Sequence, residues 1–414
     1  MLAELSRRAT GLGERAIQFA NQTAGRKLLP ETLPADLAQQ ATRFGDKALK
    51  FLSNAIERSF NPQNLVLADK TPYDTVFTQD ILSLRFYRPL DDETIDVEGA
   101  GIPVQRPAQR IPVVLVPPLA ANTLIFDLFP TRSLVRYLTA RGFNTYLIDW
   151  GEPERQHSHL RFEDYAIKMM SAALEQVRQH SGQQEVSLFG YCMGGLFCLA
   201  YAGYVHDDKL KNLITVASPI DAHQAGVAGR LFALMNRPAL WVRKYTNFRI
   251  QDLSPRLTHI PGGLNALAFK LTSPLAPLKG WLDLLLNMWD REYVEEYTTY
   301  NRIWFNNMWD YPGGLVQDIF IKLSVYNTMN RGKFTLADGK VAKLERINCS
   351  FLAFGGLSDN LVPIKAARRV MDLISSEDKQ FMEVPGGHAG VFCSSVAPTN
   401  TWKISADWLA ERSN

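Results

Sequence analysis

The chain of 414 residues is long enough to bury a large core, and its 46% hydrophobic and 21% charged residues are typical of a globular protein. The formal net charge of +3 is too small to indicate a nucleic-acid-binding protein. No stretch approaches the roughly 18 uncharged apolar residues that a transmembrane segment needs, and the N-terminus lacks the apolar core of a secretion signal.

Residues 1–62 predict an N-terminal amphipathic helical segment. From Pro34 onward, apolar residues recur at steps of three and four, which places them on one helix face: Leu37, Ala41, Phe44, Ala48, Leu52, Ala55 and Ile56. Such a face usually packs on the protein's own body. A partner helix or an apolar particle surface is the alternative occupant.

Two stretches, 63–220 and 346–414, are expected to form one α/β core. The first begins with a hairpin within 63–100 and an exposed connection at 97–110. From Ile111 onward, short apolar strands alternate with helices, and the same alternation resumes after residue 345. This alternation implies right-handed crossovers and a mostly parallel sheet with helices on its faces.

Residues 221–345 interrupt the alternation and are interpreted as an inserted, mostly helical cap. They are rich in Trp, Tyr, Leu and Met and contain no clear central strand. Most of their aromatic residues are expected to form the core of the cap, and one or two could line an apolar channel. The residues considered for these two roles are Trp281, Trp289, Trp304, Trp309 and Asp310.

Residues 185–204 contain the most informative motif. The apolar strand 186–189 runs into Gly190-Tyr191-Cys192-Met193-Gly194-Gly195, and a helical pattern follows at once. This is the strand–turn–helix arrangement of the nucleophile elbow G-x-S-x-G, with cysteine in place of serine. The new helix begins just after Cys192, and its N-terminal N–H groups favour a thiolate there. A buried structural cysteine between glycines is the alternative.

Two further residues follow strands in the order that an α/β-hydrolase fold requires, which is nucleophile, acid, histidine. Asp359 follows the strand SFLAFGG, and His388 follows the strand QFMEV within Pro-Gly-Gly-His-Ala-Gly. Each residue alone is weak evidence, but the ordered set predicts a catalytic triad of Cys192, Asp359 and His388. His388 would take the thiol proton, and Asp359 would orient the imidazole.

The tetrahedral oxyanion of such a reaction needs backbone N–H donors. One would be Met193, the residue after the nucleophile. The other should come from the loop after the strand 111–116, where prolines 117 and 118 have no N–H, so Leu119 or Ala120 must supply it. We assign Leu119.

The cysteine itself indicates a substrate class. Exchange between a thiol and a thioester is nearly balanced in free energy, whereas transfer from a thioester to an alcohol is downhill. A thiolate therefore suits an enzyme that moves acyl groups from a thioester carrier to a hydroxyl. A cap fits this chemistry, because transfer to an alcohol must exclude water.

With these residues identified, the chain resembles the polyhydroxyalkanoate synthases, particularly the shorter, two-component class III type. The resemblance covers roughly residues 65–412. The matching stretches are VLVPPLAANTLIFDL (114–128), YLIDWGEP (146–153), FGYCMGG (189–195), VASPID (216–221), WFNNMWDYPGG (304–314), YNTMNRGKFTLADGKVAKLERINC (326–349), SDNLVP (358–363) and VPGGHAGVF (384–392).

The resemblance implies a reaction and its partners. Cys192 would be the acylated nucleophile in a polymerisation of (R)-3-hydroxyacyl units from coenzyme A thioesters, with coenzyme A as the leaving group. His388 would activate both Cys192 and the 3-hydroxyl of the incoming unit. No metal or resident cofactor is expected. The growing polyester, a homodimer or second synthase subunit, and a storage-granule surface are the candidate partners.

Four scattered cysteines, none in a C-x-x-C pair, favour a reducing compartment, so a cytoplasmic location is expected. Two alternative functions stay open. One is a hydrolase on the same scaffold, either a cysteine-type intracellular polyhydroxyalkanoate depolymerase or an acyl-CoA thioesterase. The other is a catalytically degenerate protein that binds storage granules through its N-terminal helices.

Overall fold

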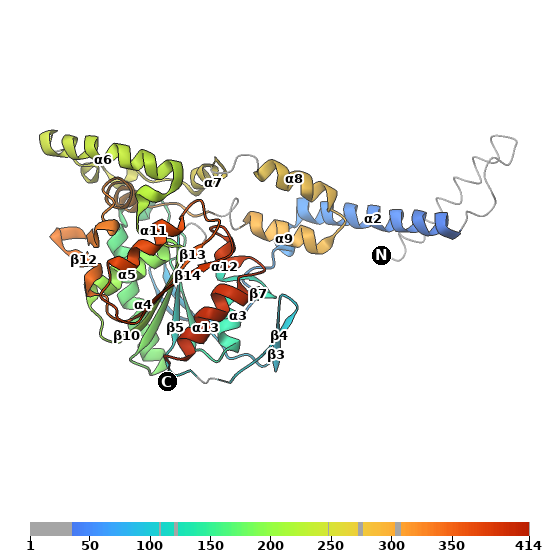
Figure 1. Cartoon of the computed structure of the whole chain (residues 1–414). Coiled ribbons are helices and arrows are strands. Elements are labelled where there is room, and N and C mark those ends of the chain that lie inside the picture. Colours follow the sequence, from blue (N-terminus) through green and yellow to red (C-terminus); the bar gives the residue numbers. More distant parts are fainter. Residues whose placement is uncertain are drawn as a thin grey trace. The chain divides into compact units, whose positions relative to one another are not determined.

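The computed structural model describes residues 35–106, 109–119, 123–246, 248–271, 276–302 and 308–413. The chain forms two compact units (Figure 1). Unit 1 comprises Met1–Val66 and Ser273–Asn301, and unit 2 comprises Leu67–Thr272 and Arg302–Asn414. The first 34 residues, Ala120 and Trp304, which entered the predictions above, lie outside the described residues.

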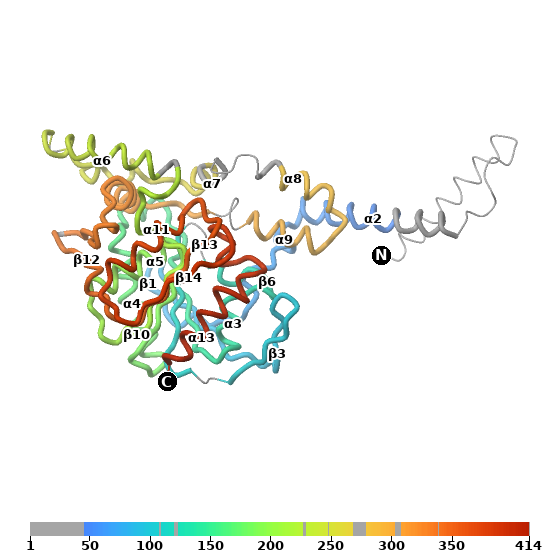
Figure 2. Tube along the Cα trace, viewed as in Figure 1, coloured from blue at the N-terminus to red at the C-terminus, as the bar shows by residue number. Residues whose placement is uncertain are grey.

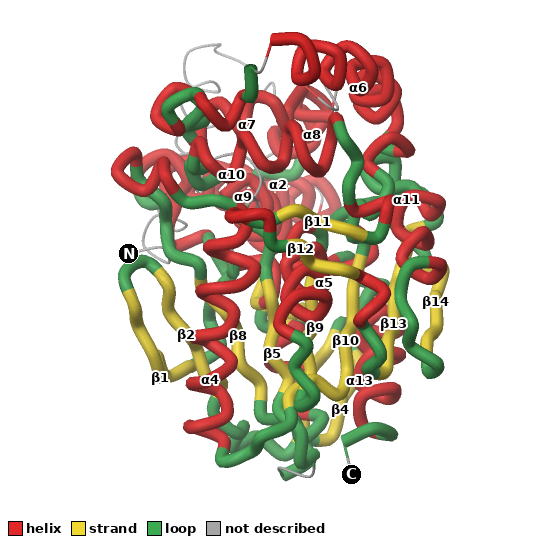
Figure 3. The backbone as a smooth tube through the Cα atoms, turned by 90° about the vertical axis from the view of Figure 1, so that its left-hand side faces the viewer, coloured by secondary structure: helices red, strands yellow, loops and turns green. Residues whose placement is uncertain are grey.

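Unit 2 is built on an eight-stranded sheet with the order β1-β2-β8-β5-β9-β10-β13-β14 (Figure 3). The β1–β2 and β2–β8 pairs are antiparallel, and every later pair is parallel. The strands are β1 (Tyr73–Gln79), β2 (Leu82–Tyr87), β5 (Val113–Val116), β8 (Thr145–Asp149), β9 (Val186–Tyr191), β10 (Leu210–Val216), β13 (Ser350–Gly356) and β14 (Lys379–Val384).

Helices cover both faces of this sheet. In Figure 1, α4 (Met170–Ser181) and α5 (Met193–Val205) lie on one side of the strands, and α3 (Leu134–Ala140) and α13 (Lys403–Ala410) lie on the other. The central strands β5 and β9 are buried along their whole length, which explains why their sequences are continuous apolar runs rather than alternating ones. The strand pattern thus reflects burial on two faces.

The other elements of unit 2 are shorter or lie outside these layers. A second hairpin occupies residues 94–103, where the sequence predicted an exposed connection from 97 onward, and a small hairpin at 333–343 lies within the predicted helical cap. The remaining strands and the helices used below are β3 (Thr94–Val97), β4 (Ala100–Pro103), β6 (Asp127–Phe129), β7 (Arg132–Ser133), α6 (Gly226–Thr246), α7 (Gly262–Leu271), α10 (Gly313–Gln317), η9 (Asp318–Val325), β11 (Lys333–Thr335), β12 (Val341–Lys343), α11 (Ile364–Arg368) and α12 (Gly390–Cys393).

Unit 1 contains α2 (Ala35–Phe60), α8 (Ala276–Leu286) and α9 (Arg291–Asn301), which Figure 2 traces in blue and gold. A small core of Leu65, Leu284, Met288 and Val294 joins them. Thus, part of the predicted cap packs with the N-terminal helix rather than with the rest of the 221–345 segment.

Among the described side chains, the apolar face predicted for the N-terminal helix packs only in part. Leu52 and Ile56 are 56% and 50% exposed. The helix is held instead through Asn54, whose buried side-chain amide donates a hydrogen bond of 2.8 Å to the carbonyl of Met288, and through the partly buried Ala55. The helical periodicity therefore predicted the helix and its contact at Ala55, but not the contact at Asn54.

The turn between β9 and α5 requires glycine because its backbone touches other backbone. A Cβ on Gly194 would lie 2.0 Å from the Val116 carbonyl oxygen, and one on Gly190 would lie 2.6 Å from the backbone of Gly195. A Cβ on Gly195 would lie 2.0 Å from the Ser218 hydroxyl. These approaches bring the start of α5 directly against the end of β5.

We predict that Gly194→Ala destabilises the protein by about 1–3 kcal/mol or more, because backbone must move to admit the new methyl group. Gly263→Ala in α7 is the matched control, since a Cβ there meets nothing within 4 Å. Because alanine favours a helix by up to about 1 kcal/mol, the control should be neutral or stabilising. Urea unfolding of both variants measures the difference, and equal stabilities would contradict the close approach.

Candidate active site

Cys192 lies at the turn between β9 and α5 in a backbone conformation that residues other than glycine rarely adopt. Its φ and ψ angles are 53° and −117°. Its N–H donates to the Val216 carbonyl at 2.8 Å, and its own carbonyl accepts from Gly195 N–H at 3.1 Å. Such strain costs of order 1–3 kcal/mol and persists only where surrounding contacts impose it, which is common at active sites.

His388 and Asp359 form a hydrogen-bonded pair at the ends of the last two strands. His388 Nδ1 lies 2.9 Å from Asp359 Oδ2. The Asp359 side chain is fully buried, and its other oxygen accepts the backbone N–H groups of Leu361 and Val362 at 2.9 and 2.8 Å. Both carboxylate oxygens therefore have hydrogen-bond donors, and these bonds fix the orientation of the Asp359 side chain beside His388.

The charges of Cys192 and Asp359 determine the protonation of His388. Burial disfavours the imidazolium ion, but electrostatic attraction to Cys192, hydrogen bonds to Asp359 and Cys192, and electrostatic attraction to Asp359 outweigh this cost. Together they raise the pKa of His388 to about 10. The structure therefore brings all three predicted residues into one interacting group.

Two tyrosines near this group were not singled out from the sequence. The hydroxyl of Tyr191 donates to the His388 carbonyl at 3.0 Å, and its ring stacks on Phe392 with centroids 4.4 Å apart. Burial, and secondarily an electrostatic interaction with Cys192, raises the pKa of Tyr311, which places the Tyr311 phenol within electrostatic range of Cys192. Tyr191 adjoins the nucleophile in sequence, whereas Tyr311 is distant from it and gave no comparable indication.

The two predicted oxyanion donors lie on segments that meet. Met193 is the first residue of α5, so its N–H has no helical acceptor four residues earlier. Leu119 is fully buried on the loop after β5, and the Trp150 indole fixes that loop by donating to the Pro117 carbonyl at 2.9 Å. The contact of Gly194 with Val116 places this loop beside the turn.

The cap residues considered above have different environments. Asp310 accepts hydrogen bonds from His259 Nε2 at 2.8 Å and from Gly262 N–H at 2.7 Å, and Trp309 packs against the main core. Trp281 is 51% exposed in unit 1, and Trp289 is half-buried in the same unit. None of these four residues has contacts that assign it to an apolar channel.

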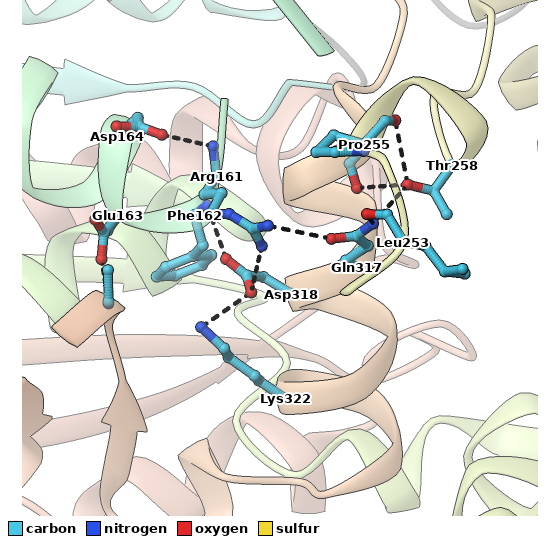
Figure 4. Close-up of polar contacts among 12 residues, drawn as sticks. Arg161, Phe162, Glu163, Asp164, Leu253, Pro255, Thr258, Gln317, Asp318 and Lys322 are labelled. Atoms are coloured by element: carbon cyan, nitrogen blue, oxygen red, sulfur yellow. Dashed lines mark hydrogen bonds and ion pairs between the residues drawn. The ribbon is translucent and has the colours of Figure 1, made fainter. Parts of the chain in front are cut away.

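A buried carboxylate ties the segment after β8 to η9 (Figure 4). Lys322 Nζ lies 2.9 Å from Asp318 Oδ1, and Arg161 Nη1 lies 3.6 Å from the same oxygen. Arg161 also donates to Gln317 Oε1 at 3.3 Å. Because an unpaired buried charge is costly, both cations stabilise Asp318, and Arg161 ties η9 to the segment after β8, a few residues from the segment that contains Tyr311.

Comparison with known proteins now identifies the family. The sequence profile of the alpha/beta hydrolase fold matches residues 111–392, more than half of the chain. The chain belongs to the α/β-hydrolase fold family. The predicted fold class is thereby confirmed, and the strand order around the Cys192 turn agrees with it.

Among curated proteins, the chain is homologous to PhaC subunits of poly(3-hydroxyalkanoate) polymerases. It is 29% identical over 351 residues to the subunit of Haloferax mediterranei, covering 84% of this chain and 65% of that protein. It is 29% identical over 345 residues to the subunit of Allochromatium vinosum, covering 83% and 89% of the two chains. The predicted resemblance to the polyhydroxyalkanoate synthases is confirmed.

Among solved structures, the monoacylglycerol lipase of Paleococcus ferrophilus aligns with a TM-score of 0.46 and 20% identity, covering 75% of this chain and 97% of that chain.

Within the described residues, no helix is long and apolar enough to cross a membrane.

The pKa of His388 yields a testable titration for this α/β-hydrolase-fold protein. Since the pKa is raised from 6.5 to about 10, the imidazolium ion should persist across the pH range between these values and lose its proton only near pH 10. Asp359→Asn removes one of the charges that favour the ion, so its His388 should titrate at lower pH. Nuclear magnetic resonance of selectively labelled histidine measures both, with His388→Gln identifying the signal. A wild-type titration at or below pH 6.5 would contradict the ion pair.

Proposed function

We propose that the chain is an acyltransferase that polymerises (R)-3-hydroxyacyl-CoA into polyhydroxyalkanoate and releases coenzyme A. The observation that supports this most is the Asp359–His388 pair in interaction with Cys192 at a strained strand–helix turn. That arrangement occurs in a chain homologous to polymerase subunits. The catalytic residues in this proposal are Cys192, His388 and Asp359.

In the first step, the Cys192 thiolate attacks the thioester carbonyl of the hydroxyacyl-CoA. The bond between sulfur and the acyl carbon forms as the bond to coenzyme A breaks, and His388 gives its proton to the departing thiolate. The products are an acyl thioester on Cys192 and free coenzyme A. One thioester replaces another, so this step is close to balanced in free energy.

In the second step, the 3-hydroxyl of the next unit attacks the acyl group on Cys192. His388, now neutral, takes the hydroxyl proton, and the Cys192 thiolate leaves as the ester bond forms. The imidazolium–thiolate pair is regenerated. Asp359 keeps the Nδ1 side of the ring occupied through the 2.9 Å hydrogen bond, so that Nε2 exchanges the proton in both steps.

Two further assignments belong to this proposal. The N–H groups of Met193 and Leu119 would donate to the oxyanion, and losing one such donor typically costs about 3 kcal/mol in the barrier. Residues 63–220 and 346–414 would form the catalytic core, and residues 221–345 would form a cap that limits access of water. Unit 1 takes part of that cap, residues 273–301.

The partners and location are also proposals. The PhaC relatives are named as polymerase subunits. We therefore propose that this chain acts with a second subunit or as a homodimer, in the cytoplasm, on a growing polyester that accumulates in storage granules.

The proposal predicts that Cys192→Ser lowers turnover by roughly a hundredfold or more, since a serine hydroxyl does not form the anion that this site stabilises. Cys349→Ser is the matched control, because burial raises the pKa of the Cys349 thiol to about 12 and leaves it inert. The assay supplies (R)-3-hydroxybutyryl-CoA and follows released thiol and polymer separately. A Cys192→Ser enzyme with near-normal turnover would contradict the mechanism.

The same assay separates the alternatives. Polymer formed in step with thiol release supports the polymerase. Thiol release with free 3-hydroxy acid and no polymer identifies a thioesterase. Consumption of added polymer would identify a depolymerase, and full granule binding by an inactive wild-type protein would favour the degenerate binding protein.

A further inference from the structure

Helix α6 displays an ordered apolar surface that no described residue covers. The helix spans Gly226–Thr246 and lies outside the helical layers of the sheet in unit 2 (Figure 1). Its large apolar side chains are among the most exposed in the chain: Leu231 is 56%, Leu234 74%, Trp241 61% and Tyr245 63% exposed.

These residues form rows along the helix. Seven residues make about two helical turns, so positions seven apart point in nearly the same direction. Leu234 and Trp241 are seven apart, and Leu231 and Tyr245 are fourteen apart on an adjacent row. The rings of Trp241 and Tyr245 lie 5.3 Å apart, which makes the stripe continuous. We call Leu231, Leu234, Trp241 and Tyr245 the α6 apolar stripe.

The opposite side of α6 packs on unit 2 and fixes the orientation of this stripe. The Phe232 ring contacts Phe320 with centroids 6.1 Å apart. The Asn236 amide donates to the Val325 carbonyl, and Arg243 lies over the Tyr326 ring at 5.8 Å. The outward direction of the apolar stripe therefore follows from contacts on the inner face.

A row of cations runs beside the stripe. Arg230, Arg237 and Lys244 are also seven residues apart, and all three are exposed. Within the described part of the chain, none of them has a carboxylate within ion-pair distance. The sequence of α6, GVAGRLFALMNRPALWVRKYT, carries four cations and no acidic residue.

We propose that α6 is an interfacial helix that binds a lipid surface bearing anionic headgroups. Around the helix, the row of cations is followed by a row that contains tryptophan and then by an apolar row. This order matches a helix that lies in the plane of such a surface. There, the leucines enter the acyl region, Trp241 and Tyr245 lie at the headgroup level, and the cations meet the anionic headgroups.

Charge distinguishes this occupant from a second copy of the chain. Two α6 helices packed through their stripes would bring cation rows together with no acidic residue on either helix to pair with them. The inference concerns binding alone and does not rest on the proposed polymerase activity.

The test is flotation of the purified full-length protein with vesicles of phosphatidylcholine, with and without about 30% phosphatidylglycerol. We expect co-flotation with the anionic vesicles and at least about tenfold weaker binding for Leu234→Glu/Trp241→Glu. Val205→Glu/Val396→Glu, which alters residues 38% and 44% exposed elsewhere in unit 2, should bind as the wild type does.

A second pair of variants isolates the cation row. Arg230→Glu/Arg237→Glu/Lys244→Glu and the control Lys70→Glu/Lys209→Glu/Lys340→Glu both change the formal net charge from +3 to −3. Only the first should abolish the preference for anionic vesicles. Equal binding by the two triple variants, or no flotation of the wild type, would overturn the proposal. So would a dimer in light scattering that Leu234→Glu/Trp241→Glu converts to a monomer, because it would assign the stripe to a second copy.

Discussion

The contact between the turn at Cys192 and the end of β5 constrains the whole candidate site. Gly194 has the Val116 carbonyl where a side chain would be, and Gly190 and Gly195 leave equally little space around the turn. This backbone approach forces Cys192 to a φ of 53° and places the first turn of α5 beside the loop that holds Leu119. Cys192, the N-terminus of α5 and the neighbouring loop are therefore positioned by a single packing feature.

The electrostatics of the site depend on that geometry. Asp359 is buried, and both of its carboxylate oxygens accept hydrogen bonds, from His388, Leu361 and Val362. Interactions with Cys192 and with Asp359 raise the pKa of His388 well above its usual value. A group in this state can release a proton to a leaving thiolate and recover one from an attacking hydroxyl, which is the alternation that the proposed chemistry needs.

Features encoded locally were predictable from the sequence. Apolar runs alternating with helical stretches identified the central strands, and the order of Cys192, Asp359 and His388 after their strands predicted a group that the structure brings together. Features that depend on distant packing were not. The periodicity of the N-terminal helix did not reveal that Asn54 would be buried while Leu52 is exposed. The sequence pattern also did not indicate that residues 273–301 would join unit 1, or that Tyr311 would interact electrostatically with Cys192.

In the proposed mechanism, Cys192 carries the acyl group during turnover. Rapid mixing with (R)-3-hydroxybutyryl-CoA, acid quenching and peptide mass spectrometry would test it most directly. If Cys192 is acylated, the peptide that contains it should carry a hydroxybutyryl or oligomeric adduct. This adduct should form as fast as the first coenzyme A is released. Release of coenzyme A with no adduct at Cys192, or with the adduct on another residue, would contradict it.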